Sequence, residues 1–149
     1  MSGALPLDQD RANEHAVGAS TRDVVAMCGA ALLAGDRDAL NALLDNDVVA
    51  LIPGRHRLSG LHRGPAAVSA ALLAPPLPGV RVVGVDVTEL LVEGSRGLLV
   101  LRTQVAVDDD DDAAVAFEVA VHVQCRDGRI VGVTEYASDQ YALDDVVGQ

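Results

Sequence analysis

Residues 114–136 read AVAFEVAVHVQCRDGRIVGVTEY, two runs rich in apolar residues that are separated by Asp127-Gly128. Apolar and polar side chains alternate along the first run, which is the pattern of a strand with one buried face. Asp-Gly accepts a positive φ at low cost and is a strong signal for a tight hairpin turn. The stretch therefore predicts two antiparallel strands, at residues 114–126 and 130–136.

Two more long strands are expected before this hairpin, at residues 80–92 and 98–107. The five consecutive aspartates Asp108 to Asp112 separate the second of them from residue 114. A calcium-binding loop spaces its ligands and includes a glycine, and this run does neither. We interpret it as a solvated hairpin loop, so the second half of the chain is predicted to be a meander of long strands.

The first half of the chain has the periodicity of helices. Thr21 can cap a helix that Gly35 ends, and Asp36 or Asp38 can start a second, short helix. A strand is expected at residues 47–52, a turn and short hairpin at residues 55–63, and a third helix from Pro65 to residue 74. A last short helix is expected from Asp139. Helices followed by a strand meander indicate an α+β fold.

Composition fits one domain of 149 residues, with residues 1–20 as a flexible tail and residues 21–149 as the folded unit. No apolar stretch approaches the ~20 residues that span a bilayer, and the first residues lack the pattern of a secretory signal. We therefore expect a cytoplasmic protein with no membrane partner. The net charge of −11 and the three aromatic residues also argue against a nucleic-acid partner.

Three stretches together resemble the SnoaL-like, or nuclear-transport-factor-2-like, superfamily. They are ALLAGDRDAL at residues 31–40; IPG at 52–54 with LSGLHRGPAAV at 58–68; and HVQCRDGRI at 122–130 leading to DQYALD at 139–144. The resemblance implies three N-terminal helices packed in a strongly curved antiparallel or mixed sheet. The sheet would form a cone with one apolar pocket for a small molecule.

The same resemblance implies that this chain lacks the catalytic groups of the best-known enzymes in the superfamily. Ketosteroid isomerases use a tyrosine on the first helix, an aspartate base at the end of the first strand and an aspartic acid on a late strand. The resemblance places Cys28, Ile52 and Val121 at these three positions. None of them has the required group, and the acid and arginine cluster of epoxide hydrolases is not evident either.

Strand alternation and the family register together assign the two faces of the sheet. The expected pocket lining comprises Cys28, Ile52, Leu101, Thr103, Phe117, Val119, Val121, Val123 and Val133. Thr103 would either orient a ligand or bond to neighbouring backbone. The opposite face is expected to carry Arg102, Gln104, His122, Gln124 and Arg126. The resemblance implies that this outer face forms a homodimer.

Glu135 is the leading candidate for a catalytic residue. The family register places Val131, Val133, Glu135 and Ala137 on the pocket side of the last strand. A carboxyl group in an apolar pocket has a raised pKa, which suits a general acid or base near neutral pH. The alternative is a register slip or bulge that leaves Glu135 in solvent and puts Tyr136 inside.

His56 and His62 lie in the hairpin and loop that should rim the pocket, where either could assist proton transfer or simply be solvated. Their spacing gives no metal site, and no metal or other cofactor is expected. Cys28 and Cys125 fit neither a disulfide framework nor a zinc site. We read them as small buried hydrophobes rather than as nucleophiles.

The leading hypothesis is a small-molecule biosynthetic enzyme that works without a cofactor on an apolar, oxygenated, polyketide-like substrate. Cyclisation, isomerisation, dehydration and epoxide opening all remain open as the reaction. The alternative is a non-catalytic ligand-binding or dimerisation protein of the same fold. A pocket plugged by Met27, Leu72 and Phe117 would favour this alternative, whereas an open pocket with converging polar groups would favour the enzyme.

Overall fold

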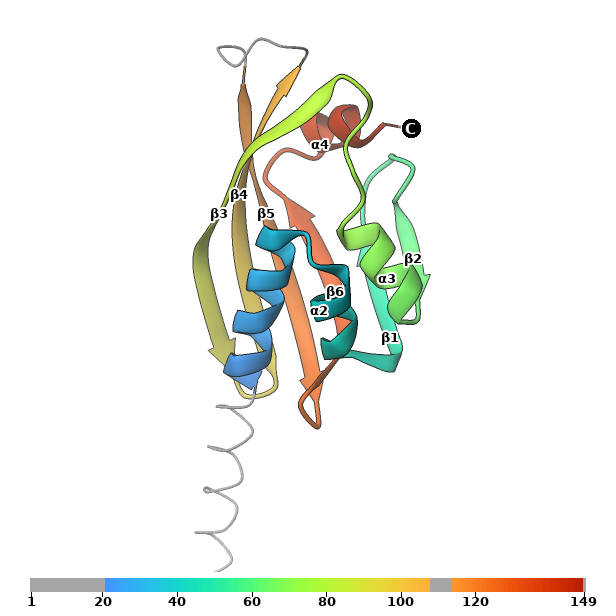
Figure 1. Ribbon diagram of the computed structural model, residues 1–149, viewed down its shortest axis with the longest axis vertical. Coiled ribbons are helices and arrows are strands. Elements are labelled where there is room, and N and C mark those ends of the chain that lie inside the picture. The colour runs from blue at the N-terminus through green and yellow to red at the C-terminus, as the bar shows by residue number, and fades with distance from the viewer. Residues whose placement is uncertain (1–20, 108–113, 149) are drawn as a thin grey trace, which may run out of the picture.

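The computed structural model describes residues 21–107 and 114–148 (Figure 1). The expected tail at residues 1–20 and the aspartate run at 108–112 lie outside these ranges. A helix covers residues 21–34. The elements that follow are α2 (Arg37–Leu43), β1 (Leu44–Ile52), β2 (Gly60–Arg63), α3 (Pro65–Leu72), β3 (Val80–Glu93), β4 (Arg96–Val107), β5 (Val115–Arg126), β6 (Arg129–Ala137) and α4 (Gln140–Val147).

Within the described residues, six strands form a single mixed sheet in the order β2-β1-β6-β5-β4-β3. Neighbouring strands are antiparallel except β1 and β6, which run parallel. The sheet bends around the N-terminal helix, α2 and α3, which lie on one of its faces, while α4 lies at one end of the strands (Figure 1). This is the α+β architecture that the sequence pattern predicted, with the curved sheet that the resemblance implied.

The helix boundaries follow from local chemistry. Gly35 has a φ of +64°, so it supplies the left-handed residue that ends the first helix. Asp36, and not Asp38, caps α2, because its side chain accepts a hydrogen bond of 3.0 Å from the backbone N–H of Ala39. Asp139 caps α4 in the same way, with a 3.0 Å hydrogen bond from the N–H of Ala142.

Three predicted boundaries were wrong by two or more residues, at the start of β1, at the end of α3 and at the start of β4, which lies at Arg96 rather than at residue 98. β1 begins at Leu44 rather than Asp47, because Leu44 already pairs with Ile130 of β6 and the polar residues that follow occupy an irregularity in that pairing. The side chain of Asp45 accepts a 3.0 Å hydrogen bond from the N–H of Asp47 within this irregularity. α3 ends at Leu72 rather than at residue 74.

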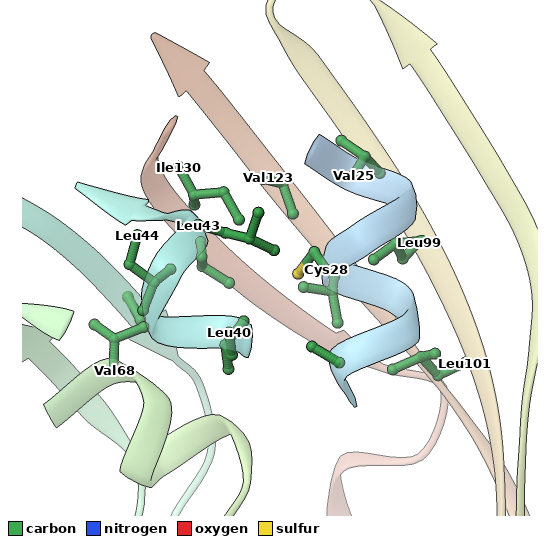
Figure 2. Close-up of a cluster of buried hydrophobic side chains, with 14 of the residues drawn as sticks. Val25, Cys28, Leu40, Leu43, Leu44, Val68, Leu99, Leu101, Val123 and Ile130 are labelled. Carbon is green, nitrogen blue, oxygen red and sulfur yellow. The ribbon is translucent and has the colours of Figure 1, made fainter. Parts of the chain in front are cut away.

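The core lies between the helices and the concave face of the sheet. Figure 2 shows Val25 and Cys28 of the N-terminal helix pointing toward β4 and β5, where Leu99 and Val123 meet them. Close approach of this helix depends on Gly97 of β4, because a Cβ there would collide with both methyl groups of Val25, 3.0 Å from Cγ1. The core therefore fixes the helix against the middle of the sheet.

The other face of the sheet has no helix on it among the described elements. Arg102, Gln104, Gln124 and Arg126 are exposed there as predicted, and His122 is half-buried. One cross-strand row on this face runs through all six strands and is mostly apolar. It consists of Leu61, Leu51, Thr134, His122, Leu98 and Leu91, and we call it the outward row.

Candidate functional site

A cavity of about 210 Å³ lies between the concave face of the sheet, α3 and α4. Six of the nine predicted lining residues do line it, namely Ile52, Leu101, Thr103, Phe117, Val119 and Val121. The other three, Cys28, Val123 and Val133, are buried in the core and do not reach the cavity. Met27 is exposed, while Leu72 and Phe117 form part of the wall, so these residues leave the cavity open.

Glu135 lines this cavity, and a β-bulge puts it there. Next to the Asp127-Gly128 turn, Cys125 pairs with Ile130. Had that register continued, the inward-facing Val121 would oppose Thr134 and Glu135 would face outward. Instead Val121 opposes Glu135, because the register shifts by one residue between Gln124 and Cys125.

The extra residue of the bulge is Val131. Ile130 pairs with Cys125 and Gly132 pairs with Gln124, which leaves Val131 without a partner on β5. The prediction that Val131 shares the inward face was therefore wrong, since Ile130 takes that place and is fully buried. The bulge does not expel Glu135, as the alternative interpretation assumed, but places it inside and leaves Tyr136 exposed.

The cavity makes Glu135 a weak acid. Burial raises the pKa of its carboxyl group from 4.5 to about 7, because the charged form loses its hydration. Among the described residues that line the cavity there is no arginine, so no opposite charge offsets this effect. At neutral pH the protonated and ionised forms of Glu135 are both substantially populated, as a general acid or base requires.

His56 lines the same cavity from the loop between β1 and β2. Its backbone N–H donates to Ser59 Oγ at 3.1 Å, and Ser59 Oγ in turn donates to the carbonyl of Pro53 at 3.3 Å. The N–H of Leu58 donates to His56 Nδ1 at 3.1 Å. This short loop therefore holds the imidazole in one orientation, with its side chain only 2% exposed.

His62 is not part of the cavity. It lies half-buried on β2, opposite Ala50 of β1, and its Nε2 donates to the carbonyl of Leu58 at 2.7 Å. Of the two predicted histidines, the structure brings only His56 together with Glu135. His62 instead braces the loop that carries His56.

α4 closes the cavity with three apolar side chains, Leu143, Val146 and Val147, none of which the sequence had singled out. Asp144 of α4 accepts hydrogen bonds from the N–H of Arg55 at 3.2 Å and from Gln140 Nε2 at 2.8 Å. A capped amphipathic helix near the end of the chain was the available signal for this closure. That it covers the β1–β2 loop could not be read from the pattern.

The same loop is fixed to the end of α4 by Arg57. Its Nε donates to the carbonyl of Val147 at 3.0 Å, and its backbone N–H donates to the carbonyl of Gly148 at 2.7 Å. The Arg57 guanidinium also donates to the carbonyl of Pro75, beyond α3. The β1–β2 loop, the end of α4 and the segment after α3 are thus held together beside the cavity.

Neither cysteine is suited to nucleophilic chemistry. Burial, with a smaller effect of the nearby Cys125 thiol, raises the pKa of Cys28 to about 12. Burial also raises the pKa of Cys125. The thiolate is the reactive form of cysteine, so both side chains act as buried hydrophobes. Within the described residues, no group of three or more His, Cys, Asp or Glu side chains is arranged to hold a metal ion.

Comparison with known proteins identifies the family. A family model described as the SnoaL-like domain matches residues 24–133, most of the chain. The chain belongs to the SnoaL-like domain family. The resemblance that the sequence motifs indicated is thereby confirmed. No functionally curated protein is significantly similar in sequence to this SnoaL-like protein.

Solved structures share its fold at low sequence identity. An NTF2-like protein from Burkholderia xenovorans LB400 is 24% identical, with a TM-score of 0.67 over 88% of this chain and 98% of the other. An LEH-like epoxide hydrolase from M. tuberculosis is 20% identical, with a TM-score of 0.60 over 84% and 89%. TerC, co-crystallised with polyporic acid, is 16% identical, with a TM-score of 0.68 over 86% and 98%.

These similarities establish the fold of the SnoaL-like protein. Proteins of this fold include a putative ketosteroid isomerase and an epoxide hydrolase. Because one fold serves several chemistries, the activity has to be argued from the cavity itself. In the described part of the chain, no helix has both the length and the apolar character needed to cross a membrane.

Proposed function

We propose that this SnoaL-like protein is an enzyme that moves a proton on a small, apolar, oxygenated molecule without a cofactor, with Glu135 as the proton carrier. The observation that carries the proposal is a carboxylic acid with a pKa of about 7 on the wall of an apolar cavity. TerC, which has a similar fold, was co-crystallised with the organic compound polyporic acid. That complex is in keeping with a small-molecule ligand here.

The arrangement favours isomerisation over dehydration and epoxide opening. Among the described cavity residues Glu135 is the one carboxylic acid, and no arginine accompanies it. Dehydration and epoxide opening each need a second acid that transfers a full proton to the departing or ring oxygen, and burial, which lowers the pKa of His56, disfavours the cationic form that could serve as this acid. A proton shift needs one group, because the carboxylate takes a proton from one carbon and returns it to another. The electrons of the broken C–H bond are held meanwhile by the substrate's conjugated oxygen.

The size of the cavity limits the substrate. A volume of about 210 Å³ lies between the ~150 Å³ cavity that holds benzene and the ~300–1,000 Å³ pockets of drug-sized ligands. A one-ring molecule with short substituents fits this range. A polyketide-like substrate would therefore be a single-ring intermediate or a short flexible chain.

The competing function is ligand binding without catalysis. The observation in its favour is that Ile52 and Val121, at two family positions of catalytic groups, line the cavity with apolar side chains. Such a protein would hold its ligand through shape complementarity and the burial of apolar surface alone. It would not need Glu135 to titrate.

Hydrogen–deuterium exchange separates the two functions without knowledge of the natural substrate. Cyclohexenone is incubated in D₂O with the protein, and deuterium at the carbons beside the carbonyl and conjugated alkene is followed by NMR. We expect the wild-type protein to accelerate exchange and Glu135→Gln to lower the rate by about 10²–10⁴-fold. The rate should rise with pH through about 7, where the carboxylate forms.

Glu93→Gln is the matched control, because it removes the same charge from an exposed side chain at the end of β3. It should exchange at the wild-type rate. Equal exchange by the wild-type and Glu135→Gln proteins would rule out Glu135 as the proton carrier. Cyclohexenone binding without any exchange would favour the non-catalytic function.

A further inference from the structure

Besides Glu135 and Thr103, the polar residues of the cavity include a histidine whose tautomer follows from its hydrogen bonds. The backbone N–H of Leu58 donates to His56 Nδ1 at 3.1 Å. A nitrogen that accepts a hydrogen bond has no proton, so a neutral ring must have its proton on Nε2. Burial lowers the pKa of His56, with Arg57 adding to this effect, and Asp144 and the Pro53 carbonyl opposing it. The ring is therefore neutral at pH 7.

The Nε2 atom of this ring is buried and makes no hydrogen bond to any described residue. Its nearest acidic neighbour, Asp144 Oδ1, lies 3.9 Å away, beyond hydrogen-bond distance. That carboxylate is already engaged, because Oδ1 accepts from Gln140 Nε2 and Oδ2 accepts from the N–H of Arg55. Buried donors are nearly always paired, so an unpaired one beside a cavity calls for a partner.

The cavity has room for a ligand that could accept this hydrogen bond. Nε2 lies on the α4 side of the ring, 3.9 Å from Asp144 Oδ1, and His56 lines the cavity together with Leu143 and Val146 of that helix. We propose that His56 Nε2–H is a ligand-binding donor that receives a neutral acceptor oxygen, such as the carbonyl of a one-ring ketone, ester or lactone. The proposal deepens the proposed function, on which its choice of cavity and ligand size rests.

The charge of the surroundings selects a neutral oxygen. Asp144 stands 3.9 Å from Nε2, and Glu135 lies on the wall of the same cavity. A ligand carboxylate or phosphate bound at Nε2 would be repelled by Asp144 and, when ionised, by Glu135. No lysine exists in the chain, and the cavity residues that the structure describes include no arginine to compensate. The oxygen that His56 binds is therefore uncharged.

Three ring compounds of one size test this inference. Cyclohexanone presents an acceptor oxygen, methylenecyclohexane replaces that oxygen by a CH₂ group, and cyclohexanecarboxylate presents an anion. Binding to the full chain is measured by NMR titration at pH 7. Long-range proton–nitrogen spectra of the labelled imidazoles report the tautomer of His56, which is assigned by comparison with a His56 variant.

We expect His56 in the Nε2–H form, and its Nε2 resonance should shift with cyclohexanone but not with methylenecyclohexane. The ketone should bind about five- to tenfold more tightly than the hydrocarbon, the usual effect of one neutral hydrogen bond. The carboxylate should bind most weakly. Equal affinity for the ketone and the hydrocarbon, or a His56 ring with its proton on Nδ1, would overturn the proposal.

Two substitutions of His56 form a matched pair. His56→Asn keeps an acceptor where Nδ1 meets the N–H of Leu58 and removes the donor at Nε2. His56→Gln places an amide donor near the position of Nε2. We expect the preference for the ketone to vanish in His56→Asn and to persist in part in His56→Gln. An unchanged preference in a folded His56→Asn protein would show that another group binds the oxygen.

Glu135→Gln separates this inference from the proposed function. It should keep the preference for the ketone, because the hydrogen bond to His56 does not depend on proton transfer. If the ketone is preferred but Glu135→Gln exchanges deuterium as fast as the wild-type protein, the proton carrier is wrong and the His56 site stands. If exchange depends on Glu135 but the protein shows no preference for the ketone, the proposed function stands and the His56 site is wrong.

Discussion

The raised pKa of Glu135 predicts that this protein loses stability as the pH rises through a defined window. Below about pH 4.5 the carboxyl group is protonated in both the folded and the unfolded chain, so it contributes no pH dependence. Between pH 4.5 and about 7 the unfolded chain releases the proton while the folded chain retains it. The folded state then binds more protons, so the free energy of unfolding falls as the pH rises. Above about pH 7 both states are ionised and the loss is complete.

The size of the effect follows from the shift. A rise from 4.5 to about 7 corresponds to roughly 3 kcal/mol at about 1.4 kcal/mol per pKa unit. This is an upper limit, because Glu135 keeps part of its surface accessible in the cavity. Glu135→Gln keeps the shape and removes the titration. Relative to this variant, we expect the wild-type protein to lose about 1–3 kcal/mol of stability between pH 4.5 and pH 8.

Urea unfolding at fixed protein concentration measures this difference. Midpoints and slopes are recorded for both proteins at half-unit steps from pH 4 to pH 8, which gives the free energy of unfolding at each pH. Glu93→Gln controls for the change in net charge, because its side chain is exposed. A difference between wild type and Glu135→Gln that stays constant across this range would refute the reasoning. The carboxyl group would then be hydrated, and the bulge would not have placed it in an apolar cavity.

Two further predictions concern packing and assembly. Gly97→Ala should destabilise the fold by about 1–3 kcal/mol, because the new methyl group collides with Val25. Gly84→Ala should have little effect on stability, because its methyl group meets only a flexible glutamine side chain. Equal urea midpoints for the two variants would contradict this prediction. We also predict that the protein forms a homodimer at micromolar concentration through the outward row, which light scattering can measure. Leu51→Lys should weaken the dimer, whereas Leu33→Lys, which changes an exposed leucine on the N-terminal helix, should not. A wild-type protein that is monomeric at this concentration would disprove the prediction.

Local patterns in the sequence were sufficient for most of the fold. The Asp127-Gly128 turn, the Gly35 helix end and the Asp139 cap each depend on a few neighbouring residues and were placed correctly, while the cap of α2 was narrowed to Asp36 or Asp38, of which Asp36 proved to be the cap. Strand alternation also assigned the inward faces of β4 and β5, because side chains in an uninterrupted strand must alternate. The family motifs added the cone and its pocket. The turn, the helix ends and the alternation of strand faces follow from backbone geometry and hydrophobic periodicity, whereas the cone and its pocket came from the resemblance.

The candidate site depended on tertiary structure at two points. A one-residue bulge at Val131 decides whether Glu135 or Tyr136 faces the cavity, and counting from the turn alone gives the opposite facing. Nothing in the order of residues requires that bulge. The bulge lies where β6 pairs with β5 on one side and with the parallel strand β1 on the other, and both pairings shift register between Ile130 and Gly132.

The second point is the contact between α4 and the β1–β2 loop that carries His56. His56 was visible in the sequence, but its fixed tautomer and unpaired Nε2–H come from the fold of residues 53–59 and from the docking of α4. Asp144 lies 88 residues further along the chain than His56. It contacts the β1–β2 loop only because the folded sheet brings that loop and α4 next to each other. The sequence by itself determined which residues could carry chemistry and which elements hold them. The tertiary structure decided which of them share a cavity, because that depends on register and on long-range packing.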